Sequence, residues 1–330
     1  MSKFGVLGSG GWGIALALQA FSKGHEVILW SPFSDEVNAL SETRESKLLK
    51  GVKIPESIVI TTDLLKVDGA DFVIIAVPSF AVRETAARLK NINCGIVINV
   101  AKGFEKETMR CLSDVILAEI SDRAVVVLSG PSHAEEVARG IPTSVVSASE
   151  DKDAAIKVQE ALISPNFRIY TNNDVTGVEV GGALKNVIAV AAGITNGLKT
   201  GDNTRAALIT RGLAEIARLG VKMGADVKTF MGLSGLGDLI VTCMSEHSRN
   251  NRFGNLVASG VNVDEALKTV GTVEGYYAVA IAKSIADKYG VEMPIVEECY
   301  NILYENKNPK DAIIELMSRP GRTETETPWM

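Results

Sequence analysis

Histidine and cysteine are scarce in this chain of 330 residues, and their scarcity excludes several kinds of chemistry. The three histidines are His25, His133 and His247. No metal-ligand spacing joins them and none is an obvious catalytic base, so we expect no metal site and no mechanism built on histidine. The four cysteines are Cys94, Cys111, Cys243 and Cys299. They lie far apart and form no CxxC pair, which predicts structural thiols in a reducing, cytoplasmic compartment.

The chain also has no excess of positive charge and no recognisable signal peptide. Its formal net charge is −6 with both signs interspersed, so we expect neither a nucleic-acid partner nor attraction to an anionic membrane surface. The N-terminus enters an apolar strand without the charged segment, apolar run and cleavage site of a signal peptide. Hydrophobic residues make up 46% of the chain, as in an ordinary globular protein, and its length is that of about two domains.

The first half of the chain alternates short apolar strands with helices. The expected strands are Phe4–Leu7, Glu26–Trp30, Asp71–Val77, Gly95–Val100, Ala124–Leu128, Ser144–Ser147 and Phe167–Tyr170. Such near-continuous apolar strands predict a sheet that is largely parallel and buried on both faces. After about Asp174 helical periods prevail, near 178–198, 205–224, 249–258, 275–289, 295–306 and 310–318. We expect an α/β domain over residues 1–180, then an all-helical domain over 181–330 that ends in a frayed tail.

A glycine-rich turn follows the first expected strand. Its sequence is Gly8-Ser9-Gly10-Gly11-Trp12-Gly13, and it opens a helix at the head of a βαβ unit, the context of a dinucleotide-binding site. Gly8 permits the tight turn, Gly10 admits the pyrophosphate, and Gly13 lets helix and strand pack closely. The N–H groups around Gly11 and Trp12 are then expected to face the phosphates. The motif predicts a Rossmann-type, doubly wound sheet that binds NAD or NADP.

The end of the second expected strand carries no residue that reads the cofactor's ribose. An NAD-specific site places an acid there, about 20 residues past the first glycine. This chain has Trp30-Ser31-Pro32-Phe33, which holds neither a carboxylate nor an arginine. The absence of this acid slightly favours NADPH over NADH and leaves open the use of both cofactors.

Lys185 is the strongest candidate for a catalytic residue, because it lies in an otherwise apolar expected helix. Burying an ammonium group is costly unless it is paired or its pKa falls. A lysine with a lowered pKa can take a hydroxyl proton and return it; the alternative is a side chain that reaches out to water. The surrounding stretch, Val180–Leu198, is about long enough to cross a bilayer. Its polar residues predict a buried core helix and no membrane insertion.

Three further clusters are candidates for the same site. Ala101-Lys102-Gly103 and Ser129-Gly130-Pro131-Ser132 each follow an expected strand, where ligands bind in open α/β sheets. Asp238, after a Gly-Leu-Gly turn, either orients Lys185 or simply caps a turn. Ser248 resembles an N-cap, so Arg249 and Asn250 would crowd a helix N-terminus, either to bind an anion or as a solvated basic face.

Together these motifs resemble, in order and over nearly the full length, the soluble bacterial NAD(P)-dependent glycerol-3-phosphate dehydrogenases. The motifs that carry the resemblance include Gly8–Gly13, Gly181–Asn186, Gly235–Asp238, Ser248–Asn250, Val273–Tyr276 and Met293–Ile295. The resemblance implies reversible reduction of dihydroxyacetone phosphate to sn-glycerol 3-phosphate for phospholipid synthesis, by a homodimer. Pro32 departs from the pattern, since relatives often carry arginine or histidine there.

The resemblance also implies a role for each candidate residue. Lys185 would be the proton donor and acceptor, with Asp238 beside it. Lys102 would contact substrate and cofactor. The other residues implied to bind substrate are Gly130, Ser132, Ser248, Arg249 and Asn250, the last three at the phosphate. Those implied to bind the cofactor are Gly8, Gly10, Gly11, Trp12, Gly13, Ala134, Arg249, Val273 and Glu274.

Two alternatives stay open. A β-hydroxyacid dehydrogenase of the 6-phosphogluconate or hydroxyisobutyrate type shares the two-domain plan and a lysine on the first helix of the second domain, but Ser248-Arg249-Asn250 argues against it. An NAD(P)-binding redox sensor without turnover would need neither a buried lysine nor an anion site. Short-chain dehydrogenases are disfavoured because no tyrosine has a lysine four residues later.

Overall fold

The computed structural model describes residues 1–245, 248–321 and 323–324. His247 and most of the expected frayed tail therefore lie outside the described residues. The chain divides into two compact units. Unit 1 comprises Met1–Lys185 and Ile216–Thr242, and unit 2 comprises Asn186–Glu215 and Cys243–Met330. We describe each unit by itself.

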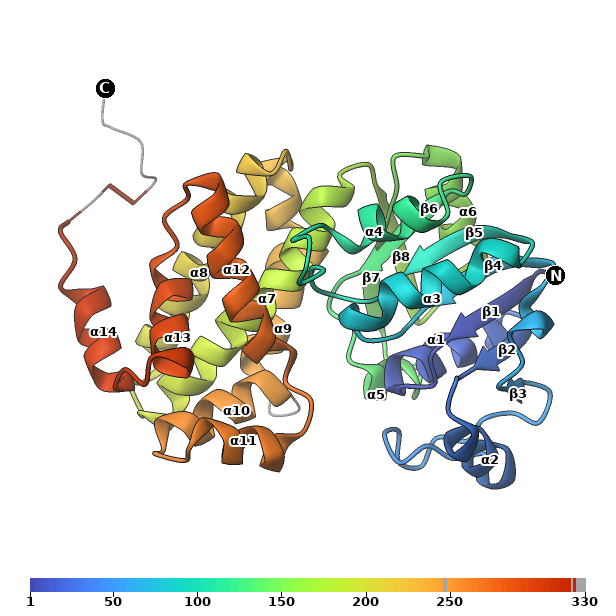
Figure 1. The fold of residues 1–330 in the computed structure, drawn as a ribbon, viewed down its shortest axis with the longest axis horizontal. Coiled ribbons are helices and arrows are strands. Elements are labelled where there is room, and N and C mark those ends of the chain that lie inside the picture. The colour runs from blue at the N-terminus through green and yellow to red at the C-terminus, as the bar shows by residue number, and fades with distance from the viewer. Residues whose placement is uncertain (246–247, 322, 325–330) are drawn as a thin grey trace. The chain divides into compact units, whose positions relative to one another are not determined.

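Unit 1 is built on one eight-stranded sheet (Figure 1) with the order β3-β2-β1-β4-β5-β6-β7-β8. Its strands are β1 (Lys3–Leu7), β2 (Glu26–Trp30), β3 (Val59–Thr61), β4 (Ala70–Ile75), β5 (Cys94–Asn99), β6 (Val125–Ser129), β7 (Thr143–Ala148) and β8 (Phe167–Asn172). Every neighbouring pair is parallel except β6 and β7. The expected Rossmann-type sheet is confirmed. The expected strands did not include β3, which has only three residues and so no readable pattern.

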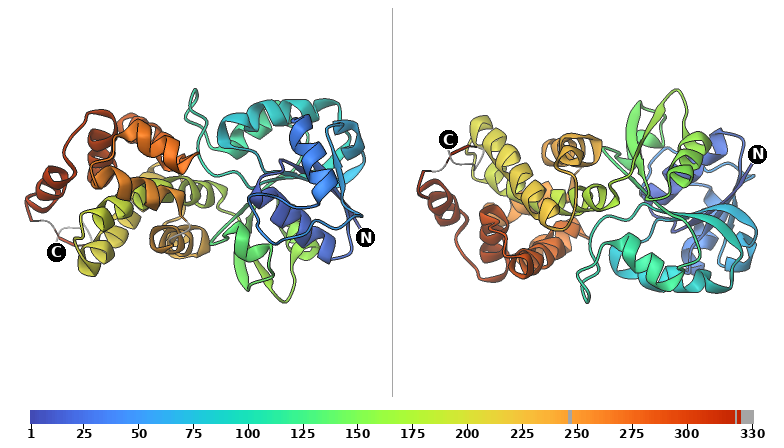
Figure 2. Two further views of the ribbon diagram at one scale, coloured as in Figure 1. Left: turned by 90° about the horizontal axis from the view of Figure 1, so that it is seen from below. Right: turned by 90° about the horizontal axis from the view of Figure 1, so that it is seen from above.

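Both faces of the sheet are covered, which explains why its strands read as unbroken apolar runs. In β4, Phe72 and Ile74 pack in a core with α1 (Gly11–Ser22) and α6 (Lys152–Leu162). Val73 and Ile75 pack in the opposite core with α3 (Val82–Arg88) and α4 (Leu112–Glu119). Figure 2 shows these helix pairs on opposite sides of the strands. The remaining helices of this part are α2 (Ser34–Thr43), η1 (Leu64–Val67), η2 (Ser79–Ala81), η3 (Leu89–Asn91) and α5 (Ala134–Val137).

The boundary between the units differs from the one expected at residue 180. It falls inside α7 (Val175–Gly197), α8 (Asp202–Lys222) and α9 (Asp238–Met244), and unit 1 takes in η4 (Val227–Met231) and η5 (Leu233–Gly237). These segments join unit 1 because η5 presses on α7: a Cβ on Gly181 would lie 2.7 Å from the carbonyl oxygen of Ser234. The apolar window of α7 is long enough for a membrane span but entirely buried, which confirms the predicted core helix.

The described part of unit 2 contains helices and no strand, as expected. After the unit's shares of α7 and α8 come α10 (Arg249–Ala258), α11 (Val263–Val270), α12 (Glu274–Tyr289), α13 (Pro294–Tyr304) and α14 (Pro309–Met317). Two glycines let α7 and α10 approach backbone to backbone. A Cβ on Gly193 would lie 2.1 Å from the Asn251 carbonyl oxygen, and one on Gly254 would lie 2.2 Å from that of Val190. This crossing fixes the start of α10 against α7.

Candidate active site

The glycine-rich turn between β1 and α1 has the shape of a dinucleotide site. Gly8 has φ of +119° and donates its N–H to the Trp30 carbonyl at 2.9 Å, which joins the turn to the end of β2. A Cβ on Gly13 would lie 2.0 Å from the Gly8 carbonyl oxygen, so helix and strand touch there. A Cβ on Gly10 would meet no atom within 4 Å, so that side of the turn is open.

The open side of this turn suits an anionic group. Gly10 is the N-cap of α1 and provides no side chain to the first-turn N–H groups. Among the described residues, the buried hydroxyl of Ser9 has no hydrogen-bond partner. Ala134 lies beside the turn, since its Cβ is 3.6 Å from where a Gly11 Cβ would stand. The residues expected to hold the pyrophosphate of NAD or NADP therefore fit that group.

The end of β2 carries a carboxylate that the sequence analysis missed. The buried Ser31 hydroxyl donates a hydrogen bond to Oε2 of Glu36 at 2.7 Å. Glu36 lies in the first turn of α2, three residues past its N-cap Phe33. An acid in the first turn of a helix is a readable signal, but Glu36 lies beyond the strand end, where a ribose-binding acid is normally expected.

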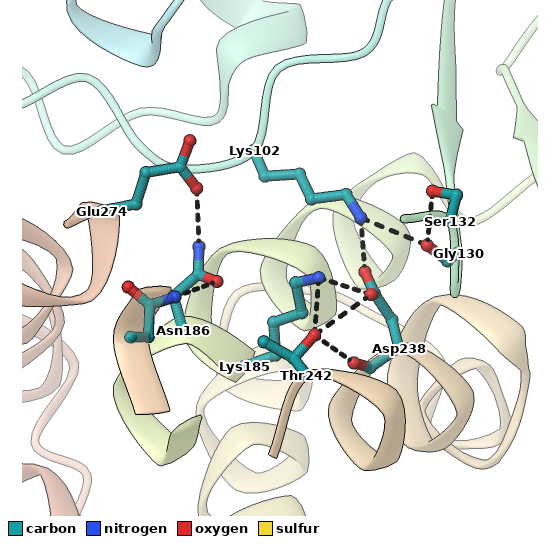
Figure 3. Close-up of polar contacts among 9 residues, drawn as sticks. Lys102, Gly130, Ser132, Lys185, Asn186, Asp238, Thr242 and Glu274 are labelled. Carbon is teal, nitrogen blue, oxygen red and sulfur yellow. Dashed lines mark hydrogen bonds and ion pairs between the residues drawn. The ribbon is translucent and has the colours of Figure 1, made fainter. Parts of the chain in front are cut away.

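Lys185 is buried, and Figure 3 shows what its ammonium group contacts. Nζ donates to Oδ1 of Asp238 and, at 2.9 Å, to the hydroxyl of Thr242. The other carboxylate oxygen, Oδ2, accepts from Nζ of Lys102 at 2.6 Å. Thr242 in turn donates to the Asp238 backbone carbonyl at 2.6 Å. Two ammonium groups thus share one carboxylate whose side chain is 1% exposed.

This arrangement places the pKa of Lys185 near neutrality. Burial and the neighbouring charge of Lys102 together lower the pKa of Lys185 to about 8, although the Asp238 carboxylate opposes this shift. Burial alone would raise the pKa of Asp238, but the Lys102 and Lys185 charges outweigh it and keep that pKa below its ordinary value. Asp238 is therefore ionised at neutral pH, while Lys185 can both hold and release a proton.

The carboxyl ends of β5 and β6 deliver the neighbouring groups. Lys102 follows β5 and also donates to the Gly130 carbonyl at 3.2 Å. The same carbonyl accepts from the Ser132 hydroxyl at 2.9 Å (Figure 3). On α7, Gly182 lies close to both turns, because a Cβ there would lie 3.1 Å from the Ser129 hydroxyl and in ordinary contact, 3.6 Å, with Cγ of Lys102. Unit 1 thus brings together five expected residues: Lys102, Gly130, Ser132, Lys185 and Asp238.

In unit 2 a chain of amide bonds joins three elements. The Gly275 N–H donates to Oδ1 of Asn250 at 2.9 Å, and the Asn250 amide donates to Oδ1 of Asn186 at 2.9 Å. Asn186 donates to Glu274 at 3.1 Å (Figure 3). Both ends of the Asn250 amide are therefore engaged within the protein. Its backbone N–H and the second hydrogen of its amide are left for a ligand.

The N-terminus of α10 has the features expected of an anion site. Ser248 is the N-cap, and its hydroxyl accepts the N–H of Asn251 at 3.3 Å. The N–H groups of Arg249 and Asn250 have no partner among the described residues, and the Arg249 side chain is exposed. At the start of α12, Glu274 is exposed, whereas the Val273 side chain is fully buried.

Thr242 is the member of the lysine cluster that sequence reasoning missed. It lies one helical turn after Asp238, so the two share a face of α9. That spacing was readable once Asp238 was placed on a helix. The Gly-Leu-Gly motif before Asp238 indicates a turn, which hides the helix that follows it.

Two family models together match most of the chain. Residues 3–155 match the family model described as NAD-dependent glycerol-3-phosphate dehydrogenase N-terminus, and residues 174–314 match the one for its C-terminus. A glycerol-3-phosphate dehydrogenase (NAD(P)+) of Fusobacterium nucleatum is 48% identical over 334 residues, covering 99% of this chain and 100% of that protein. One of Moorella thermoacetica is 52% identical over 327 residues, covering 98% and 97%. The crystal structure of a glycerol-3-phosphate dehydrogenase from Coxiella burnetii superposes with a TM-score of 0.92 at 39% identity, over 96% of this chain and 99% of that one.

Proposed function

Because the chain belongs to the NAD-dependent glycerol-3-phosphate dehydrogenase family, we propose that it reduces dihydroxyacetone phosphate reversibly to sn-glycerol 3-phosphate with NADH or NADPH. The product would supply glycerophospholipid synthesis. Three relatives that match this chain over nearly its full length are all named glycerol-3-phosphate dehydrogenase. The two alternative functions, a β-hydroxyacid dehydrogenase and a redox sensor, are therefore not favoured. We place the pyrophosphate of the cofactor in unit 1 and the hold on the substrate phosphate in unit 2; the other proposed cofactor contacts, Arg249, Val273 and Glu274, belong to unit 2.

The observation that carries the proposal is the buried Lys185 on Asp238. When bound, the reduced nicotinamide supplies the hydride that reaches the carbonyl carbon. The Lys185 ammonium donates its proton to the carbonyl oxygen, and in the reverse direction the neutral amine takes it back. Asp238 orients Nζ through its Oδ1, and Thr242 fixes a second hydrogen of the ammonium group. Lys102 adds a positive charge that stabilises the developing alkoxide.

Arg249 and the start of α10 are proposed to hold the substrate phosphate. An arginine at a helix N-terminus opposes the helix dipole unless an anion lies between them. The guanidinium and the free N–H groups of Arg249 and Asn250 supply donors for one phosphate. The Ser248 hydroxyl contributes by capping the helix, since it already accepts the Asn251 N–H.

We also propose that the enzyme is a cytoplasmic homodimer. The thiols of Cys94, Cys111 and Cys299, which form no disulfide, support a reducing compartment. The dimer rests on the family resemblance alone. Sedimentation equilibrium of the purified protein tests it, and a mass equal to that of one chain, 35.1 kDa, would contradict it.

The activity is tested by following the absorbance of NADH and of NADPH with dihydroxyacetone phosphate. We expect oxidation of the cofactor with this substrate and little with unphosphorylated dihydroxyacetone, since an empty anion site contributes nothing to transition-state binding. Equal rates with the two substrates would refute the assignment.

A further inference from the structure

Glu179, in the core of unit 1, is a buried carboxyl that the proposed reaction does not use. It lies on α7 and is 5% exposed. It accepts the Ser113 N–H at 3.0 Å, the Ser113 hydroxyl, and Nδ2 of Asn99 at 3.4 Å. Burial raises the pKa of Glu179 to about 7, although the bonds from Ser113 and Asn99 oppose the rise. Such a group costs stability in a core, which points to a role that an apolar side chain would not fill.

Asn99 links Glu179 to the turn that carries Lys102. Asn99 is the last residue of β5 and is fully buried. Its Oδ1 accepts the N–H of Ala101 at 3.1 Å, while its Nδ2 donates to Glu179 and, at 3.4 Å, to the Ala101 carbonyl. The Asn99 amide therefore holds the backbone directly before Lys102, and Glu179 holds the Asn99 amide.

The same carboxyl lies on the helix that carries the second lysine. Lys185 follows Glu179 by six residues on α7, which is about 9 Å along the helix axis. Lys102 and Lys185 then meet at the two oxygens of Asp238. Glu179 thus joins α7 to the turn after β5 at a second point, separate from Asp238.

We propose that Glu179 is a positioning residue for the dehydrogenase reaction, acting through Asn99 to hold Lys102 in register with Lys185 over Asp238. The inference rests on the proposed function, since it assumes that both lysines serve that reaction. Without Glu179 the Asn99 amide loses an acceptor and the turn before Lys102 gains freedom. Lys102 then leaves Asp238 for part of the time, and Lys185 loses a neighbouring positive charge.

Two substitutions separate positioning from mere packing. Glu179→Gln keeps all three contacts, because its carbonyl oxygen accepts from Ser113 and Asn99 while its NH₂ donates to the Ser113 hydroxyl. We expect its kcat within about twofold of wild type. Glu179→Leu keeps the bulk and loses the contacts. We expect its kcat to fall about 10- to 100-fold, the cost of a misplacement of about 1 Å, with the Kd for NADH unchanged.

The pH profile and a double mutant give readouts that a structural role would not move. The groups facing Lys185 are Asp238, Lys102, Thr242 and His133. Because the Lys102 charge lowers the pKa of Lys185, Glu179→Leu should move the alkaline limb of kcat for reduction to higher pH. In a Lys102→Met background, Glu179→Leu should have no further effect on kcat, since the residue it acts through is gone.

A destabilised control and a crystal structure complete the test. Val158→Ala removes core bulk from α6 in the same unit and should lower Tm with kcat unchanged. Crystal structures should show Lys102 Nζ bonded to Asp238 in Glu179→Gln and displaced from Asp238 in part of the molecules of Glu179→Leu. If Glu179→Leu does not fold, Asn99→Ala tests the same link.

The outcomes separate this role from the proposed function. A wild type inactive on dihydroxyacetone phosphate overturns the proposed function and this role with it. If the wild type is active, any of three results overturns the positioning role alone. These are a full kcat in Glu179→Leu, an equal loss of kcat on adding Glu179→Leu to Lys102→Met, and a Lys102 side chain that has not moved in the crystal structure of Glu179→Leu.

Discussion

Lys185 is tolerated in the core because its charge has two partners, Asp238 and Thr242. We expect Lys185→Met, which keeps most of the stem's bulk, to fold and to bind NADH normally, since the glycine-rich turn is untouched. Its kcat should fall by about 10² to 10⁴, the usual loss on removing a positioned acid or base. Turnover measured beside the exposed control Lys222→Met checks this. A variant that retains more than about a tenth of the activity would move proton transfer to another residue, with Lys102 next in line.

The direction of the pH dependence follows from the same residue. The pKa of Lys185 is lowered to about 8, and reduction needs the protonated ammonium as donor. Reduction should therefore hold its rate below that pH and fall about tenfold per pH unit above it. Oxidation needs the neutral amine, so its rate should rise about tenfold per pH unit below that pH and level off above it. Profiles of kcat in both directions test the assignment, and parallel profiles would contradict it.

Glu36 changes the expectation for cofactor choice. The strand end alone favours NADPH, but the carboxylate beside Ser31 offers an acceptor to a ribose 2′-hydroxyl and repels a 2′-phosphate. We expect NADH to bind at least about tenfold more tightly than NADPH, or roughly 1.4 kcal/mol. Glu36→Gln should narrow that gap, because it removes the charge and keeps an acceptor for Ser31.

Fluorescence titration with each cofactor measures this preference without turnover. Glu42→Gln, an exposed carboxylate on the same helix, makes the same change of net charge and should leave the ratio of the two affinities unaltered. Equal affinities in wild type, or the same shift in both variants, would show that Glu36 does not face the ribose.

At the scale of elements, the turn between β1 and α1 separates a glycine needed for folding from one needed for binding. Gly13→Ala would put a Cβ 2.0 Å from the Gly8 carbonyl oxygen, so the backbone must shift at a cost of about 1–3 kcal/mol. Gly10→Ala meets no atom within 4 Å, and φ of −65° suits alanine. It should leave stability unchanged or about 0.4–1 kcal/mol higher, while its methyl group occupies the space proposed for the pyrophosphate.

Urea unfolding and NADH titration of the two variants decide the point. Gly13→Ala should lose stability. Gly10→Ala should keep its midpoint and lose about tenfold or more in NADH affinity. Normal NADH binding by Gly10→Ala would place the cofactor away from this turn.

The sequence predicted those helices and strands whose residue pattern can be recognised within the element itself. Doubly buried strands such as β4 and β5 read as apolar runs because both of their faces are covered. The N-cap Ser248 was also readable, since its hydroxyl bonds within the first turn of its own helix. Short elements such as β3 and α5 were not, because three or four residues show no period.

At the scale of the whole molecule, the division into units was not readable from the sequence. The segment 216–242 follows a stretch of unit 2 along the chain yet belongs to unit 1. Its place depends on packing at Gly181 and on the bond from Lys102 to Asp238, whose partners are 136 residues apart. Motif order identified Asp238 as a site residue, but no local pattern shows that one carboxylate is shared by two lysines.

The division also separates the proposed proton-transfer group from the proposed phosphate group, so each can be impaired alone. We expect Arg249→Ala, in unit 2, to damage use of dihydroxyacetone phosphate while the Lys185 cluster of unit 1 stays intact. Truncating one partner of a charged pair costs about 2–5 kcal/mol, or roughly 30- to 5,000-fold in kcat/KM. Part of the loss should appear in kcat, because the grip on a remote phosphate also orients the reacting carbon.

Rescue by a free anion distinguishes a phosphate site from a surface charge. Phosphite added with unphosphorylated dihydroxyacetone should raise the wild-type rate, because the anion fills the site that the truncated substrate leaves empty. The same addition should not help Arg249→Ala. Arg252→Ala removes an equal charge from an exposed position on the same helix and should respond to phosphite as wild type does. If kcat/KM of Arg249→Ala stays within about threefold of wild type, Arg249 is a solvated charge and another group holds the phosphate.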